Sequence, residues 1–124
     1  MPKVFIIDDD MTMVYLLRTL LEMDGYEVAE VQDWDAIIET VQAESPDLVL
    51  MDYFLTDLDG LELLTQLRTD PMLAEIRIIM SSGMDVSDQC MAAGADAFLL
   101  KPYTPEQLAE VIKETVGEDG AGKK

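Results

Sequence analysis

The sequence predicts an α/β protein in which a doubly wound, five-stranded parallel sheet is covered by five helices. Short apolar runs alternate with amphipathic stretches along the whole chain. The amphipathic stretches are long enough to cross from one strand to the next as helices. The length of 124 residues suits one domain built around a single sheet.

The predicted strands are short runs rich in Val, Ile, Leu and Phe. They span residues 4–7, 26–31, 48–51, 76–80 and 97–100. The third run contains only apolar residues, as expected of a central strand with helices on both faces. Polar residues follow every run, so each strand has a defined carboxyl end.

Apolar residues at helical spacing, together with capping residues, predict the five helices. They span residues 11–23, 33–44 with Asp33 as the N-cap, 61–69, 85–93 and 104–116. Asp10 is expected to cap the first helix, and Gly94 is expected to end the fourth. Thr104 and Gln107 have the spacing of a capping box at the start of the last helix.

The composition excludes several classes of function. Acidic residues outnumber basic ones by 26 to 8, which gives a formal charge of −18. This charge argues against direct binding to nucleic acid or insertion into an anionic membrane, because both would repel the chain. The chain contains no His, which excludes Ser-His and Cys-His catalysis and His-ligated zinc.

Cysteine content and hydropathy predict a cytoplasmic protein. The single cysteine, Cys90, cannot form an internal disulfide. The first apolar run is too short for a signal peptide or a membrane span. We expect a stand-alone domain over residues 1–117 and a flexible polar tail over residues 118–124.

Candidate functional residues follow four of the five predicted strands. They are Asp8, Asp9 and Asp10 after the first, Asp52 after the third, Ser81, Ser82 and Gly83 after the fourth, and Lys101 and Pro102 after the fifth. The carboxyl ends of parallel strands meet at one edge of a sheet, where ligands bind. Clustered carboxylates repel one another, and a hard divalent cation such as Mg²⁺ would relieve the repulsion.

The other groups at this edge suit phosphoryl chemistry. The Lys101 amine suits a phosphoryl group, and Ser82 and Gly83 offer a hydroxyl and an unobstructed backbone N–H. An Asp carboxylate beside such groups can attack phosphorus and form an acyl phosphate. Taken singly, each residue also has an ordinary explanation as a helix cap, a turn residue or a surface charge. Only their joint occurrence favours a site.

With these motifs in this order, the chain resembles a response-regulator receiver domain of the CheY-like type over residues 3–116. The motifs are residues 6–9, 48–52, 59–63, 78–83 and 94–102. The resemblance implies the flavodoxin-like strand order 2-1-3-4-5. It also implies a phosphoacceptor switch of a two-component system or phosphorelay that requires Mg²⁺.

The resemblance assigns roles to individual residues. Asp52 would be the phosphoacceptor. The implied Mg²⁺ ligands are the side chains of Asp9 and Asp52, the backbone carbonyl of Phe54, and Asp8 through a water. The implied phosphoryl-binding groups are Ser82, Lys101 and the backbone of Tyr53, Phe54 and Gly83. Ser82 and Phe98 would form the switch, and the Lys101–Pro102 bond would be cis.

The resemblance also implies partners. A sensor histidine kinase or a histidine phosphotransfer protein would donate the phosphoryl group, and phosphorylation would change the contacts with a downstream protein. The chain would catalyse only its own phosphorylation and dephosphorylation, so it is not expected to be an enzyme in the usual sense. It would be a monomer or a phosphorylation-dependent dimer.

The sequence departs from the family pattern in three places. Thr56 stands where the family usually has proline. Phe54 and Met84 are bulky and apolar, and we hypothesise that they obstruct water and lengthen the phosphorylated lifetime, which Phe54→Asn would test. The stretch from Ser82 to Gly94 is about one helical turn shorter than usual.

Two other kinds of protein match part of this pattern. Asp52, Phe54 and Thr56 partly match the Asp-x-Asp-x-Thr loop of small haloacid-dehalogenase-like phosphohydrolases, but Phe54 replaces the acid/base aspartate. A flavin-binding module would need a loop rich in Ser, Thr and Gly after the first strand, whereas this chain has three aspartates that would repel phosphate.

Overall fold

The structure is a computed structural model that describes residues 2–116. A parallel five-stranded sheet has the order β2-β1-β3-β4-β5, which confirms the expected 2-1-3-4-5 topology. The strands are β1 (Lys3–Ile7), β2 (Glu27–Glu30), β3 (Leu48–Asp52), β4 (Arg77–Ser82) and β5 (Ala97–Leu100). The predicted tail, residues 118–124, lies outside the described residues, so it stays a prediction.

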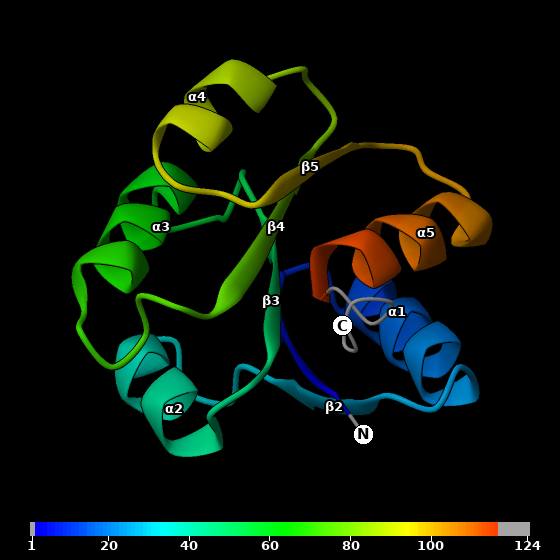
Figure 1. Cartoon of the computed structure of the whole chain (residues 1–124), viewed down its shortest axis with the longest axis horizontal. Coiled ribbons are helices and arrows are strands. Elements are labelled where there is room, and N and C mark those ends of the chain that lie inside the picture. The colour runs from blue at the N-terminus through cyan, green and yellow to red at the C-terminus, as the bar shows by residue number, and fades with distance from the viewer. Residues whose placement is uncertain (1, 117–124) are drawn as a thin grey trace.

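Five helices cover the two faces of the sheet. They are α1 (Met11–Met23), α2 (Ile37–Glu44), α3 (Gly60–Thr69), α4 (Ser87–Ala92) and α5 (Pro105–Val116). Figure 1 shows α1 and α5 on one face and α2, α3 and α4 on the other. No helix within residues 2–116 is long and apolar enough to cross a bilayer.

Alternate residues of the central strands form two apolar cores. In β3, Val49 and Met51 pack in the core on the side of α2 and α3, whereas Leu48 and Leu50 pack in the core on the side of α1 and α5. All four are almost fully buried. This two-sided burial explains why the run contains no polar residue.

Most of the predicted helix ends are observed. The Asp10 carboxylate accepts hydrogen bonds from the Thr12 and Met13 N–H groups and caps α1. Thr104 and Gln107 form the capping box of α5, with reciprocal bonds of 3.0 and 2.8 Å. Gly94 follows the end of α4 with φ of 110°.

The predicted start of α2 was wrong, because the helix begins four residues after the expected cap. The Asp33 carboxylate accepts a hydrogen bond from the Asp35 N–H, and its carbonyl accepts one from Ala36. These bonds close a turn that competes with the first turn of a helix. The helix starts at Ile37 behind Ala36, which makes no side-chain capping bond.

At the amino-terminal edge of the sheet, Arg68 in the last turn of α3 joins three segments. Its guanidinium donates to the carbonyls of Gly94 at 2.7 Å and Ile76 at 2.6 Å, and to the Asp96 carboxylate at 2.6 Å. A side chain at Gly94 would lie 2.9 Å from Arg68 Cγ, so this approach requires glycine. Asp96 also accepts the Ile78 N–H at 2.8 Å.

Candidate functional site

Three carboxylates meet at the carboxyl-terminal edge of the sheet. Asp8 and Asp9 follow β1, and Asp52 is the last residue of β3. One oxygen from each lies within 4.8 Å of the others. The β1–β3 pairing places them together, because it brings Ile7 opposite Met51.

The Lys101 amine reaches into this group from the end of β5. Its Nζ lies 3.1 Å from Asp52 Oδ1 and 3.6 Å from Asp8 Oδ2. The Asp8 side chain is only 4% exposed and that of Asp52 is 12% exposed. The Lys101–Pro102 peptide bond is cis, the isomer that the resemblance implies.

Burial sets the electrostatics of the site. It raises the pKa of Asp8 and of Asp52, because the charged carboxylate loses solvation, and the attraction of Lys101 only partly opposes this. Hydrogen bonds from Thr56 lower the pKa of Asp9. One amine therefore faces three carboxylates, and the site would be stabilised by further positive charge.

The donor set fits a hard divalent cation. Carboxylate oxygens from Asp8, Asp9 and Asp52 converge, and oxygen ligands of this kind suit Mg²⁺. No Lys or Arg other than Lys101 pairs with these carboxylates within residues 2–116. The cluster could therefore hold a metal ion.

Ser82 and Gly83 form the wall on the β4 side. Ser82 is fully buried, and its Oγ accepts a hydrogen bond from the Met84 N–H at 3.0 Å. The space beside Gly83 is open, since a Cβ atom placed there would have no heavy atom within 4 Å outside the two adjoining residues. A ligand can therefore approach the Gly83 backbone.

One predicted phosphoryl-binding group makes another contact in this structure. The Tyr53 N–H donates to the Ser81 carbonyl at 2.8 Å, which extends the pairing of β3 with β4. A contact with a phosphoryl oxygen would require this bond to be exchanged, so the predicted role of Tyr53 stays a prediction. The Tyr53 ring makes an edge contact with the ring of Phe54, which is 52% exposed.

Phe98, the predicted switch aromatic, lies in β5, opposite Met80 of β4. It is half-buried and packs against the core on the α2–α4 side. Helix α4 has six residues and begins at Ser87, two residues after the predicted start. It is as short as the spacing from Ser82 to Gly94 indicated.

Comparison with known proteins identifies the family. The family model of the response regulator receiver domain matches residues 4–113. The chain belongs to the response regulator receiver domain family. It is 31% identical over 118 residues to the chemotaxis protein CheY of Bacillus subtilis, covering 92% of this chain and 97% of CheY.

Other relatives of this receiver domain are longer proteins. The phosphate regulon transcriptional regulatory protein PhoB of Pseudomonas aeruginosa is 30% identical over 122 residues, which cover 96% of this chain and 53% of PhoB. The chain spans about half the length of this and the next two curated relatives that it matches.

Solved structures have the same fold. A putative response regulator from Chloroflexus aurantiacus superposes with a TM-score of 0.86 at 27% identity, covering 94% of this chain and 98% of that one. The receiver domain of the sensor histidine kinase PA1611 from Pseudomonas aeruginosa superposes at 0.82 with 22% identity, covering 94% and 98%. At that identity the second likeness concerns the fold alone.

Sequence reasoning missed Tyr103, whose buried side chain lies near Asp8 and Asp52. Its hydroxyl is buried and has no hydrogen-bond partner within the described chain. Burial, reinforced by the charges of Asp8 and Asp52, raises the pKa of Tyr103 to about 12. Nothing in the sequence signals this, because a tyrosine after Lys-Pro suggests only packing.

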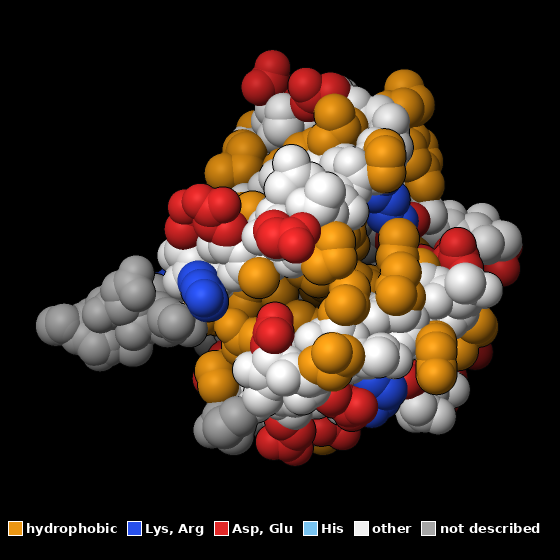
Figure 2. Space-filling model, turned by 90° about the vertical axis from the view of Figure 1, so that its right-hand side faces the viewer, with side chains coloured by type: hydrophobic (Ala, Val, Ile, Leu, Met, Phe, Trp, Pro, Cys, Tyr) orange, Lys and Arg blue, Asp and Glu red, His pale blue; other side chains and the backbone are white. Residues whose placement is uncertain are grey.

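An apolar groove adjoins Lys101. It has a volume of about 300 Å³ and lies between α1 and the start of α5. Its walls are Met13, Leu16, Leu17, Leu20, Pro102, Tyr103 and Pro105. Figure 2 views this side of the receiver domain and shows apolar side chains gathered across it, with acidic side chains among and around them.

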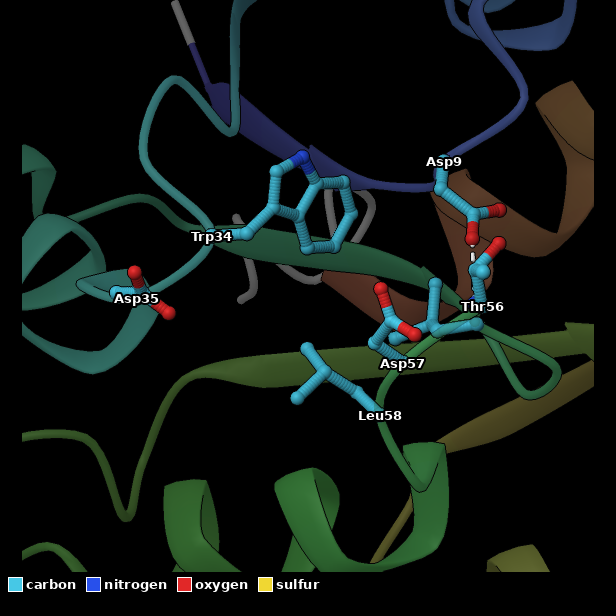
Figure 3. A pocket seen from close by; sticks show the side chains of 7 residues that line it. Asp9, Trp34, Asp35, Thr56, Asp57 and Leu58 are labelled. Atoms are coloured by element: carbon cyan, nitrogen blue, oxygen red, sulfur yellow. Dashed lines mark hydrogen bonds between the residues drawn. The ribbon is translucent and has the colours of Figure 1, made fainter.

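A second cavity lies on the other side of Asp9. It has a volume of about 270 Å³ and is lined by Asp9, Trp34, Asp35, Leu55, Thr56, Asp57 and Leu58 (Figure 3). Trp34 lies in the turn before α2, which begins at Ile37, and its side chain lines this open pocket.

Proposed function

We propose that this receiver domain is a phosphoacceptor switch of a two-component system and that Asp52 accepts the phosphoryl group. The observation that carries the proposal is the Lys101 amine, 3.1 Å from Asp52 within a group of three carboxylates. Asp52 joins the cluster from a central strand, and the neighbouring Gly83 backbone is open to a ligand.

In the proposed reaction, a carboxylate oxygen of Asp52 attacks the phosphorus of a phosphohistidine on the donor protein. The phosphorus–nitrogen bond breaks as the phosphorus–oxygen bond forms. The imidazole keeps the electron pair of the broken bond and takes a proton from water. The Lys101 ammonium offsets charge on the transferring group, and the product is an aspartyl phosphate.

Within this proposal, Asp9, Asp52 and the Phe54 carbonyl hold Mg²⁺, and Asp8 acts through a water. Bound Mg²⁺ would supply positive charge opposite the phosphoryl oxygens. The PA1611 receiver domain is described with a magnesium ion coordinated in its active site cleft. The convergence of the carboxylates in this chain supports the assignment.

The switch follows from the same contacts. Ser82 would exchange its hydrogen bond with the Met84 N–H for one to the phosphoryl group. Phe98 would then move further into the core, and the surface around β5 would change its partner preference. The phosphoryl group acts by favouring one of two states through its differential contacts.

A sensor histidine kinase or a histidine phosphotransfer protein is the proposed donor. The apolar groove beside Lys101 supports a protein donor, because exposed apolar surface of this kind often marks a protein contact. A cytoplasmic location belongs to the same proposal, supported by Cys90, a buried free thiol. The haloacid-dehalogenase alternative has no further support.

The test is labelling by acetyl phosphate with Mg²⁺, read as the mass gain of one phosphoryl group. Wild type should gain the group and Asp52→Asn should not. Asp57→Asn, which removes an exposed carboxylate from the same loop, should be labelled like wild type. Label that persists in Asp52→Asn would contradict the assignment, and a chelator should abolish labelling of the wild type.

A further inference from the structure

The pocket around Trp34 combines an aromatic ring, an apolar wall and negative charge. Trp34 comes from the loop after β2, and Leu55, Asp57 and Leu58 come from the loop after β3. Asp9 closes the end nearest the acidic cluster. None of the lining residues is a Lys or Arg. Nothing that the wall supplies therefore neutralises its three carboxylates.

The side chains are arranged around a shared space. Figure 3 shows the Trp34 ring extending towards the Asp9 end, with the Asp57 carboxylate directed to the same space from the opposite loop. Trp34 is 37% exposed. Within the described chain, the Asp57 carboxylate has neither an ion-pair nor a hydrogen-bond partner. Both groups are thus free to contact a ligand.

We propose that this pocket binds a guanidinium or alkylammonium group, as carried by an arginine or lysine side chain. The face of an indole attracts an organic cation, and a carboxylate accepts charge-assisted hydrogen bonds from it. The leucines suit the apolar stem that carries such a cation. A guanidinium is favoured over an ammonium, because it is planar and stacks on aromatic rings.

Size and chemistry exclude the other classes of ligand. Three carboxylates repel a phosphate or a carboxylate. The volume of about 270 Å³ lies just below the roughly 300–1,000 Å³ of pockets for drug-sized ligands, so a single long side chain is the suitable size. Within the described residues, the acidic side chains that converge closely enough to hold a metal ion are Asp8, Asp9 and Asp52, so Asp35 and Asp57 do not form a second such group in this pocket.

The pocket lies next to the acidic cluster, so a cation bound in it would lie there too. Asp9 belongs both to the pocket and to the acidic cluster, and its Oδ2 accepts the Thr56 N–H. A cation in the pocket would lie beside the cluster without touching Asp52, which does not line the pocket. A protein that presents an arginine here would be held against the carboxyl-terminal edge of the sheet.

Trp34 is the only tryptophan of the chain, so its fluorescence reports directly on the pocket. The probe is N-acetyl-arginine amide, and the control is N-acetyl-citrulline amide, which has the same shape without the charge. We expect a saturable fluorescence change with the arginine probe, and affinity at least roughly tenfold weaker for citrulline, or about 1.4 kcal/mol. Equal affinities would overturn the proposal.

Two matched variants locate the cation. Asp57→Asn should weaken binding of the arginine probe roughly fivefold, as for loss of an exposed charge contact. Asp33→Asn removes the same charge from the Trp34 loop outside the pocket and should leave the affinity within about twofold. Equal effects would refute a specific contact. Trp34→Leu should also bind the arginine probe several-fold more weakly. Because this variant lacks the fluorophore, its binding is measured from the NMR shifts of the Thr56 and Asp57 backbone amides.

The acidic cluster is excluded by a separate measurement. Asp52→Asn keeps the pocket intact, so the arginine probe should bind it as tightly as wild type. Loss of binding in this variant would place the cation in the cluster and overturn the proposal. A failure of Asp52 to accept a phosphoryl group would leave this result unaffected, so the two proposals can fail independently.

The source of the cation is decided by comparing agmatine with acetyl-Gly-Arg-Gly-amide. Binding of the peptide at least as tight as that of agmatine indicates a protein side chain, because the flanking peptide groups are tolerated. Binding of agmatine alone indicates a free guanidino compound. Binding of neither contradicts the proposal.

Discussion

The two edges of the sheet use their cations in opposite ways. At the amino-terminal edge, the Arg68 guanidinium donates to three backbone carbonyls and to Asp96, so its hydrogen-bonding capacity is well used. At the carboxyl-terminal edge, the Lys101 amine faces three carboxylates, two of them with pKa values raised by burial. The unpaired Tyr103 hydroxyl lies beside them.

This contrast separates stability from function. Arg68 donates hydrogen bonds to backbone carbonyls in turns, where these carbonyls would otherwise have no partner. Such bonds stabilise the fold. The carboxylates around Lys101 repel one another until further positive charge arrives. A site of this kind reduces stability in order to bind a ligand. Four substitutions test the contrast.

Lys101→Met should have the largest effect, a fall in the rate at which Asp52 is phosphorylated. Removing one charged group that stabilises the transferring phosphoryl group typically costs about 10²–10³ in rate. The measurement is the initial rate of labelling by acetyl phosphate with Mg²⁺. Arg68→Met should be labelled at the wild-type rate below its unfolding temperature. Labelling of Lys101→Met at the wild-type rate would remove Lys101 from the mechanism.

Arg68→Met should have the largest effect on stability. It breaks an ion pair and several bonds to carbonyls, so we expect the free energy of unfolding to fall by about 3 kcal/mol. Urea unfolding measures the change. Arg77→Met is the matched control, since Arg77 is exposed and makes one side-chain bond, to the Thr115 carbonyl at 3.1 Å. Equal losses in both variants would show that Arg68 is an ordinary surface residue.

Asp8→Asn should stabilise the protein at pH 7 without divalent cations, by about 1 kcal/mol. Burial raises the Asp8 pKa, so the folded state binds its proton more tightly than the unfolded state. Ionisation of Asp8 therefore costs stability as the pH rises, and the gain should vanish below about pH 4, where both states are protonated. Urea unfolding across this range measures the gain.

Mg²⁺ provides the control for that substitution. It should stabilise the wild type more than Asp8→Asn, because the variant lacks one carboxylate of the cluster. A loss of stability in Asp8→Asn at pH 7 without Mg²⁺ would mean that the carboxylates and Lys101 compensate one another fully. The contrast between the two edges would then be wrong.

Tyr103→Phe should have the smallest effect, a gain of about 0.5–1 kcal/mol in the free energy of unfolding. The substitution removes a buried hydroxyl without a partner, whereas loss of a bonded hydroxyl usually destabilises. Tyr15→Phe is the control, because Tyr15 is 74% exposed and the change should be close to zero. A loss of about 1 kcal/mol in Tyr103→Phe would indicate that the hydroxyl is satisfied in solution.

The sequence was most informative where functional residues directly follow strands that the hydrophobic pattern locates. The acids after β1 and β3 and the lysine after β5 could be placed together because parallel strands end at one edge. The Arg68 contacts could not be predicted, because they join residues 8 and 26 positions away, which no helical or strand period relates. The start of α2 was missed because the Asp33 side chain bonds equally well within a turn.

The Trp34 pocket was also beyond sequence reasoning. It requires the loops after β2 and β3 to lie next to each other, and loop conformations carry no periodic signal. The hydrogen bond of the Tyr53 N–H is a second example. This group pairs with the Ser81 carbonyl of β4, and no sequence pattern indicates that bond. The motifs identified which residues form the site. The hydrogen-bond partner of each polar group depended on the fold and could not be identified from the motifs.

The open space beside Gly83 and the burial of Cys90 together make the chain easy to label. Burial raises the pKa of the Cys90 thiol and shields it from reagents. A Cβ atom at Gly83 would have no heavy atom within 4 Å outside the two adjoining residues, so a cysteine introduced there could carry a fluorophore in an otherwise natural background. The emission of such a dye would follow the arrival of a phosphoryl group in real time.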